Sequence, residues 1–253
     1  MTTVGEPTSI RYNIALMLAG ARIARTAAMD DIEANLERVR ERVARAAARS
    51  GRRPDDVLLI GVSKTVDVER IRQALAAGLG ALGENRVQEA KTKVEALGRP
   101  VPWHLIGHLQ TNKARDAVEL FDVIHSIDRV ELAHAVERRA HALSRVVDAL
   151  VEVNVGGETS KGGVAPDGVG ALLDALRGLG HLRVRGLMAI PPAVERAEDA
   201  RSWFRALREL AERHGVKELS MGMSADFEVA IEEGATMVRV GTAIFGARPA
   251  RAA

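Results

Sequence analysis

The chain of 253 residues contains no cysteine, and this absence excludes several classes of function. Disulfide bonds, thiolate nucleophiles and metal sites built from cysteine cannot form. The sequence also lacks an apolar run of about 18 residues that could cross a membrane. The candidate targeting segment, residues 14–28, is interrupted by Arg22 and Arg25. We therefore expect a soluble, cytoplasmic protein with no membrane partner.

A strong charge of one sign is absent as well. The 36 basic and 34 acidic residues leave a formal net charge of +2, and the two signs alternate along the predicted helices. The one basic cluster, between Arg40 and Arg53, is explained by the solvated face and end of a helix. The sequence therefore predicts no nucleic-acid surface.

Lysine is scarce: the chain has six lysines against thirty arginines. Lys64 closely follows the apolar run Leu58–Val62, which is typical of a strand buried on both faces in a parallel sheet. Chemistry gathers at the carboxyl ends of such strands. An amine in a dry site there has a lowered pKa and forms a Schiff base with an aldehyde, which a guanidinium cannot do. The alternative is a lysine that merely extends to solvent.

The rest of the chain repeats a short apolar strand, a loop and a helix. This alternation predicts an α/β fold, a single (β/α)8 TIM barrel, with a capped helix from Ile32 to Ala47 before strand one. We expect residues 1–28 to be a flexible N-terminal extension, residues 29–248 the barrel and residues 249–253 a tail. Besides strand one, the predicted strands are Ala81–Gly83, Trp103–Gly107, Val123–Ile127, Leu150–Val155, Val184–Ile190, Glu218–Met221 and Met237–Val240.

Two glycine-containing loops follow strands seven and eight, where such barrels often bind phosphate. They are Gly222–Ser224 and Gly241–Ala243, and we expect Ser224 to cap the helix that carries Asp226 and Glu228. The alternative is two ordinary turns. A lysine after strand one and a phosphate site at strands seven and eight would hold a phosphorylated aldehyde at both ends, as pyridoxal 5'-phosphate requires.

The sequence resembles the pyridoxal phosphate homeostasis proteins of the YggS/PROSC type, whose barrel is similar to that of alanine racemase. The resemblance runs from about Met29 to Gly246 and rests on several motifs in order. They are Val62–Thr65, Gly83–Glu89, Trp103–Lys113, His125–Asp128, Gly186–Met188, Leu219–Ser224 and Val238–Gly246.

The resemblance implies roles for individual residues. Lys64 would bind pyridoxal 5'-phosphate as an aldimine. The phosphate would be held by Ser224 and by amides around Met223, Gly241 and Thr242. Asn85 would contact the ring, and Arg239 would face the pyridine nitrogen, which makes the ring a poorer electron sink. Arg239 could instead pair with a carboxylate inside the barrel, and Met188 could be either a ring contact or a packing residue.

A two-base racemase needs a second acid or base on the other face of the ring. In alanine racemase this group is a tyrosine from another domain. The only tyrosine here is Tyr12, outside the matching region. His104, His108 and His125 could substitute in principle, but structural roles are expected for them, and we predict no metal site. Lys161 is either a second amine for the aldehyde or a solvated lysine, and its glycine-rich loop lacks the spacing of a nucleotide-binding loop.

Three functions follow from these residues. We expect a monomer that carries pyridoxal 5'-phosphate on Lys64 and takes part in its intracellular homeostasis, without catalytic residues of its own. Its protein partners would be apoenzymes that depend on this cofactor. The alternatives are an amino-acid racemase of low activity and a phosphate-binding barrel without aldehyde chemistry.

Overall fold

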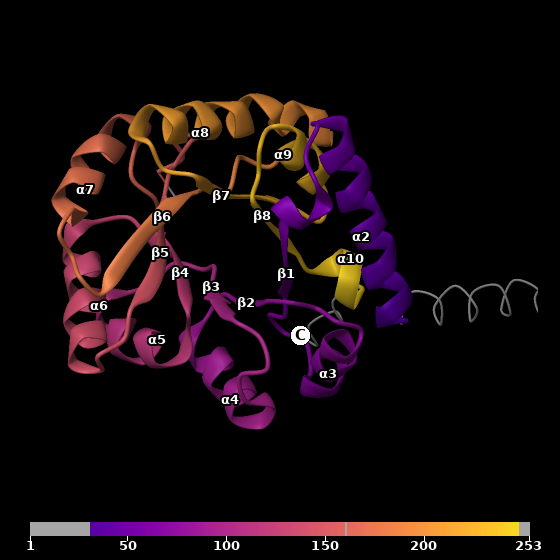
Figure 1. The fold of residues 1–253 in the computed structure, drawn as a ribbon, viewed down its shortest axis with the longest axis horizontal. Coiled ribbons are helices and arrows are strands. Elements are labelled where there is room, and N and C mark those ends of the chain that lie inside the picture. The colour runs from indigo at the N-terminus through magenta and orange to yellow at the C-terminus, as the bar shows by residue number, and fades with distance from the viewer. Residues whose placement is uncertain (1–30, 160, 248–253) are drawn as a thin grey trace, which may run out of the picture.

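The computed structural model describes residues 31–159 and 161–247 and shows a closed barrel of eight parallel strands. Figure 1 shows the ring of strands with helices around it. Each strand pairs with the next in the chain, and β1 closes the ring by pairing with β8 as well as β2. The strands are β1 (Leu58–Val62), β2 (Leu82–Glu84), β3 (Trp103–Leu105), β4 (Val123–Ile127), β5 (Val147–Glu152), β6 (Leu182–Met188), β7 (Glu218–Met223) and β8 (Met237–Val240).

The helices lie on the outside of the barrel, and one follows each strand (Figure 1). They are α2 (Ile32–Arg49), α3 (Val68–Ala76), α4 (Val87–Leu97), α5 (Ala114–Leu120), α6 (Val130–Ala142), α7 (Val169–Leu176), α8 (Arg201–His214), α9 (Phe227–Glu232) and α10 (Thr242–Phe245). Short 3-10 turns occur at Pro54–Asp56, Thr111–Lys113, Pro166–Gly168 and Ala197–Ala200. The predicted TIM barrel is confirmed.

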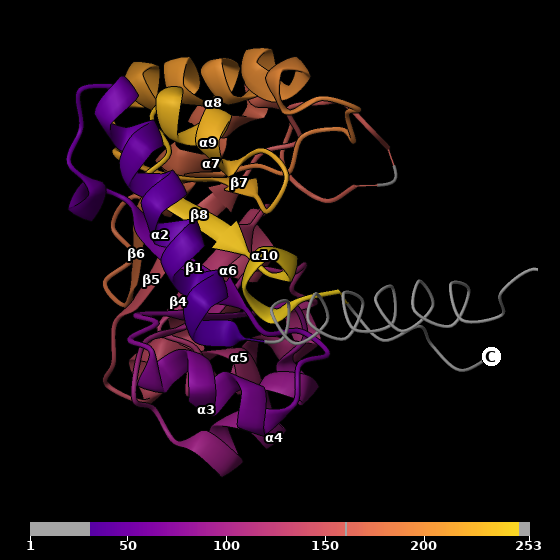
Figure 2. The same ribbon diagram turned by 90° about the vertical axis from the view of Figure 1, so that its right-hand side faces the viewer.

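The helix before strand one completes the outer wall of the barrel. As predicted it begins at Ile32, with the Asp31 carboxylate accepting a hydrogen bond from the Ala34 N–H at 3.1 Å. The helix α10 after β8 has only one turn, and α2 packs against α3, α9 and α10 in the space that this short helix leaves (Figure 2). Buried Asn35 donates to the Ile244 carbonyl at 2.9 Å and thereby joins α2 to α10.

Apolar packing divides into two layers. The larger cluster lies between strands and helices, whereas Ile60, Ala81, Leu150 and Met188 come from different parts of the ring and meet inside it. Met188 is fully buried in this inner cluster, so the structure shows it as a packing residue.

The predicted extension (residues 1–28), Tyr12 and the predicted tail (residues 249–253) lie outside the described residues. In residues 31–159 and 161–247 we find no helix with the length and apolar character needed to cross a bilayer.

Candidate functional site

Lys64 lies in a tight turn directly after β1. The Ser63 carbonyl accepts a hydrogen bond from the Val66 N–H at 2.9 Å, which closes the turn around Lys64 and Thr65. Thr65 has a φ of +62°, a strained value for a β-branched residue. Val62 is in register with Gly83, so the chains that leave β1 and β2 bring Lys64 toward Asn85. Lys64 and Asn85, two of the predicted site residues, are therefore at the same edge of the barrel.

A buried ionic cluster supports this turn from the side of α4. The Lys93 ammonium donates to Glu84 Oε1 and Glu89 Oε1, both at 2.7 Å, and to the Ser63 carbonyl at 2.5 Å. Ser63 Oγ donates to Glu84 Oε1 at 2.6 Å. The side chains of Lys93 and Glu84 are only 7% and 0% exposed. Sequence reasoning missed this cluster, although the spacing of Glu89 and Lys93 by four residues on a helix was a signal for one of its pairs.

Ser224 does not cap α9, the helix that carries Glu228, so that prediction is wrong. Residues 223–226 form a turn in which the Met223 N–H donates to Asp226 Oδ1 at 2.6 Å, and α9 begins only at Phe227. Ser224 Oγ instead accepts from the Gly241 and Ala243 amides at 3.2 and 3.4 Å. These two amides, from the N-cap and the first turn of α10, thus converge on one oxygen atom, as they would on an oxygen of a phosphate.

A pocket of about 490 Å³ opens between the turn after β1 and the loop after β8. Lys64, Thr65, Gly241 and Thr242 are among its lining residues. Gly241 lies against β1, since a Cβ atom on it would come within 3.3 Å of the Val62 carbonyl oxygen. The structure therefore brings together the predicted lysine and part of the predicted phosphate site.

A larger pocket, of about 840 Å³, lies at the other end of the barrel. It is lined by α2 and by the amino ends of β1, β7 and β8, and none of the predicted site residues contributes to it. Because the lysine and the glycine loops lie at the carboxyl ends of the strands, we place the candidate site there rather than in the larger pocket.

A chain of hydrogen bonds crosses the barrel interior to Arg239. The guanidinium donates to Ser220 Oγ at 2.5 Å and to the Ala189 carbonyl at 2.9 Å. Ser220 Oγ is 2.9 Å from His125 Nδ1, and His125 Nε2 is 2.9 Å from His104 Nδ1. No carboxylate of the described residues forms an ion pair with Arg239, so the alternative of a pairing inside the barrel is not what the structure shows.

Burial controls the charges along this chain. It lowers the pKa of His104 to about 4 and that of His125 well below its ordinary value, the latter with help from His104 and Arg239. Both imidazoles are therefore neutral near pH 7 and have structural contacts, as predicted. Burial also lowers the pKa of Arg239 to about 10, which still leaves a cation at neutral pH.

Carboxylates gather at the mouth of the barrel after β4 and β5. Burial and the neighbouring Asp128 raise the pKa of Glu152 to about 7. His108 Nδ1 lies 3.7 Å from Asp128 Oδ2, a neighbour that sequence spacing did not reveal. The loop after β5 passes close by, because a Cβ atom on Gly162 would be 3.1 Å from His108 Nδ1.

Within the part of the chain that the structure describes, no three His, Asp or Glu side chains are arranged to hold a metal ion.

Lys161 belongs to the same loop and contacts the loop after β6. Its ammonium donates to the Pro191 carbonyl at 3.1 Å and pairs with Glu158. Lys161 is therefore a half-buried lysine engaged with neighbouring loops rather than the solvated lysine of one alternative, and a second site for the aldehyde stays a prediction.

Several buried polar atoms have no hydrogen-bond partner within the described chain. Asn85 Oδ1, Ser126 Oγ and Glu152 Oε2 belong to this group, and their residues lie in or directly after β2, β4 and β5. Buried polar atoms are normally satisfied, so partners from water or from a polar ligand are expected here. Together with the amine, the buried cation and the converging amides, these atoms fit pyridoxal 5'-phosphate, which has an aldehyde, a phosphate and a polar ring.

Comparisons with known proteins identify the family of the chain. Residues 29–249 match the family described as "Alanine racemase, N-terminal domain". The chain is 49% identical over 220 residues to the pyridoxal phosphate homeostasis protein of Aquifex aeolicus, which covers 84% of this chain and 96% of that protein.

Solved structures give the same result. PipY of Synechococcus elongatus, solved with PLP bound, is 39% identical to this chain with a TM-score of 0.71. The match covers 81% of this chain and 100% of PipY. Alanine racemase of Clostridium difficile is 16% identical with a TM-score of 0.68, and the match covers 88% of this chain but 58% of the racemase, so it shows the fold alone. The chain therefore belongs to the family of pyridoxal phosphate homeostasis proteins.

Proposed function

We propose that this protein binds pyridoxal 5'-phosphate on Lys64 and acts in the carriage and homeostasis of the cofactor inside the cell. The observation that carries the proposal is the pocket shared by the Lys64 turn and the Gly241–Thr242 loop. PipY, which is 39% identical and was solved with PLP bound, supports pyridoxal 5'-phosphate as the ligand. The cofactor would supply an aldehyde, with which the Lys64 amine condenses to a Schiff base with loss of water.

The other residues of the site would bind and orient the molecule. Ser224 and the amides of Gly241 and Thr242 would hold the phosphate, and Met223 would join them if its N–H exchanges Asp226 for the phosphate. Asn85, whose Oδ1 lacks a partner in the described chain, would contact the ring.

Arg239 favours carriage over turnover. Its guanidinium has only donors, so a pyridine nitrogen facing it accepts a hydrogen bond and is not protonated. An unprotonated ring withdraws electrons weakly and stabilises a substrate carbanion poorly. We therefore propose a protein that holds the cofactor rather than a racemase.

The wider assignment follows from the same proposal. Residues 29–248 would be the binding unit, residues 1–28 an extension and residues 249–253 a tail. We propose a cytoplasmic monomer that delivers the cofactor to apoenzymes. The exposed large apolar side chains of the described residues are few, and apart from the neighbours Leu143 and Val146 they come from separate parts of the fold, which supports a monomer.

Reductive trapping tests the proposal. The purified protein is incubated with pyridoxal 5'-phosphate, its visible absorbance is recorded, and borohydride treatment is followed by peptide mass spectrometry. We expect the modification on Lys64 and loss of the absorbing species in Lys64→Ala, which should still fold because the residue lies at the rim. Lys217→Ala, a change just before β7 at the opposite end of the barrel, is the matched control.

Two results would contradict the proposal. Modification of the wild-type protein on another amine, with none on Lys64, would place the aldehyde elsewhere. Rapid interconversion of D- and L-alanine by the loaded protein would identify the racemase instead.

A further inference from the structure

The turn that carries Lys64 is held on both sides by charged groups of α4. Before Lys64, the Ser63 carbonyl accepts from the Lys93 ammonium at 2.5 Å. After Lys64, the Thr65 N–H donates to Glu89 Oε1. Glu89 and Lys93 are themselves paired at 2.7 Å, so one ion pair contacts the backbone on either side of the lysine. The position of this turn therefore depends on α4 as well as on β1.

The Lys93 ammonium has no donor left for another role. An ammonium has three N–H donors, and the Ser63 carbonyl, Glu84 and Glu89 accept all three. The turn thus carries Lys64 and contacts Lys93, whose ammonium is fully engaged by these three acceptors.

Stability alone is a weak explanation for such a cluster. Removing Lys93 and Glu84 from water costs desolvation free energy, and apolar side chains of similar size could fill the space as well. Burial raises the pKa of Glu84. Burial opposes ionisation of Glu89 too, but its bonds from Lys93 and Thr65 outweigh this and hold its pKa below the ordinary value. The cluster is therefore a costly arrangement whose charged contacts converge on one backbone turn.

The backbone of the turn gives a reason for these contacts. Thr65 is one of two residues other than glycine with positive φ among the described residues, and its side chain is β-branched. Such a conformation persists only where the surroundings hold it. Glu89 bonds the N–H of this same residue, and Lys93 bonds the carbonyl that closes the turn.

We propose that Lys93, together with Glu84 and Glu89, is a positioning residue that holds the strained Ser63–Thr65 turn and thereby aims the Lys64 amine at the aldehyde. This inference rests on the proposed function of Lys64. Loss of the cluster leaves the phosphate contacts on the loops after β7 and β8 in place. It therefore weakens covalent attachment specifically, and not binding of the whole cofactor.

Two ligands measured on the same variants separate these effects. Pyridoxal 5'-phosphate tests attachment to Lys64, whereas pyridoxamine 5'-phosphate has the same ring and phosphate but no aldehyde. In Lys93→Met we expect the dissociation constant of pyridoxal 5'-phosphate to rise by about tenfold to a hundredfold, as misplaced reacting groups typically cause. The dissociation constant of pyridoxamine 5'-phosphate should change little. Lys91→Met, an exposed position on the same helix, should behave as the wild type for both ligands.

If Lys93→Met fails to fold, Glu89→Gln still tests the positioning role. This variant is expected to fold because Lys93 retains Glu84 as a partner. It should show the same selective loss in smaller measure. Wild-type affinity for pyridoxal 5'-phosphate in the folded variants, or an equal loss for both ligands, would overturn the positioning role. Absence of a Lys64 adduct in the wild-type protein would instead overturn the proposed function.

Discussion

Arg239 has only donor groups on its guanidinium, so Ser220 accepts the hydrogen bond between them. The Ser220 hydroxyl can then donate its own proton to His125 Nδ1, and neutral His125 donates from Nε2 to His104 Nδ1. We assign these tautomers because they give every proton between Arg239 and His104 an acceptor. A single arginine thus sets the direction of a hydrogen-bond chain across the barrel and is itself held in a fixed orientation.

Glu152 gives a pH-dependent prediction. Its pKa rises from an ordinary 4.5 to about 7 in the folded protein, because of burial and then Asp128. The folded state therefore holds this proton more tightly than the unfolded chain does. Its contribution to stability is complete below about pH 4.5 and is lost as the pH rises to about 7. At about 1.4 kcal/mol per pH unit, the loss reaches up to about 3 kcal/mol.

Glu152→Gln removes this titration. In urea unfolding of the cofactor-free protein, we expect the variant to gain stability relative to the wild type between about pH 4.5 and 7, with the difference then levelling off. A stability difference that stays constant over this range would show that Glu152 titrates normally.

Single residues were predictable where a local pattern marked them. Lys64 was identified because a buried strand ends abruptly in a charge, and that position follows from the sequence alone. Lys93 was not, because two of its three acceptors, Ser63 and Glu84, lie on other elements. Ser224 was predicted in the correct loop with the wrong partner, since a turn closed by Asp226 delays the start of α9.

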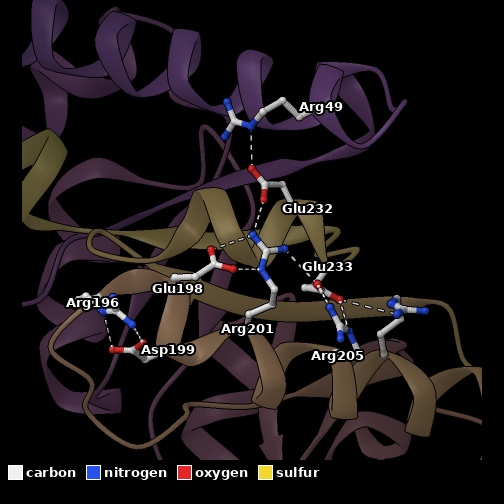
Figure 3. A network of polar contacts seen from close by, with 9 residues as sticks. Arg49, Arg196, Glu198, Asp199, Arg201, Arg205, Glu232 and Glu233 are labelled. Carbon is white, nitrogen blue, oxygen red and sulfur yellow. Dashed lines mark hydrogen bonds and ion pairs between the residues drawn. The ribbon is translucent and has the colours of Figure 1, made fainter.

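At the scale of elements, α2 is attached to the barrel by ions as well as by apolar contacts. Figure 3 shows Arg201 of α8 among three carboxylates, Glu198, Glu232 and Glu233. Glu232 also accepts from Arg49 of α2 at 2.7 Å and from Arg201 at 2.6 Å. One residue of α9 thereby connects the first described helix to α8, although the two are far apart in sequence.

Glu233 is the buried member of this network, with a side chain 7% exposed and with Arg201 and Arg205 at 3.0 and 2.9 Å. We expect Glu233→Gln to lower the free energy of unfolding by about 1 to 3 kcal/mol, as for lost charged hydrogen bonds. Glu212→Gln, which removes the exposed partner of Arg208, should change it by less than about 0.5 kcal/mol. Denaturant unfolding measures both, and equal losses would show that burial does not determine the value of these pairs.

Element types were predictable from periodicity, whereas boundaries depended on neighbours. The strand predicted as Leu150–Val155 is β5 at Val147–Glu152, because its first residues pair with Leu182 and Arg183 of β6. Val153 beyond it forms an isolated bridge with Val164, although its N–H still donates to the Met188 carbonyl at 2.8 Å. The short second strand, predicted as Ala81–Gly83, is β2 at Leu82–Glu84, a shift of one residue. All three residues of β2 are buried.

For the whole molecule, closure of the ring could be predicted from eight repeats, because each repeat supplies one strand and a cover for it. The polar interior could not. His104, His125, Ser220 and Arg239 are far apart in sequence and meet only once the barrel closes. The larger pocket at the opposite end was also beyond prediction, since it forms between α2 and strand ends from three parts of the chain.

The last prediction concerns the extent of the independent unit. The family match begins at residue 29, and the α2 cap at Asp31 is the first described contact. We expect removal of residues 1–28 to change the free energy of unfolding by less than about 0.5 kcal/mol and to leave pyridoxal 5'-phosphate binding intact. Removal of residues 1–50 also deletes α2, with buried Leu36, Val39 and Asn35, and should prevent folding. Thermal unfolding and ligand titration of both truncations decide the point, and a large loss in the shorter deletion would place part of the folded unit before residue 29.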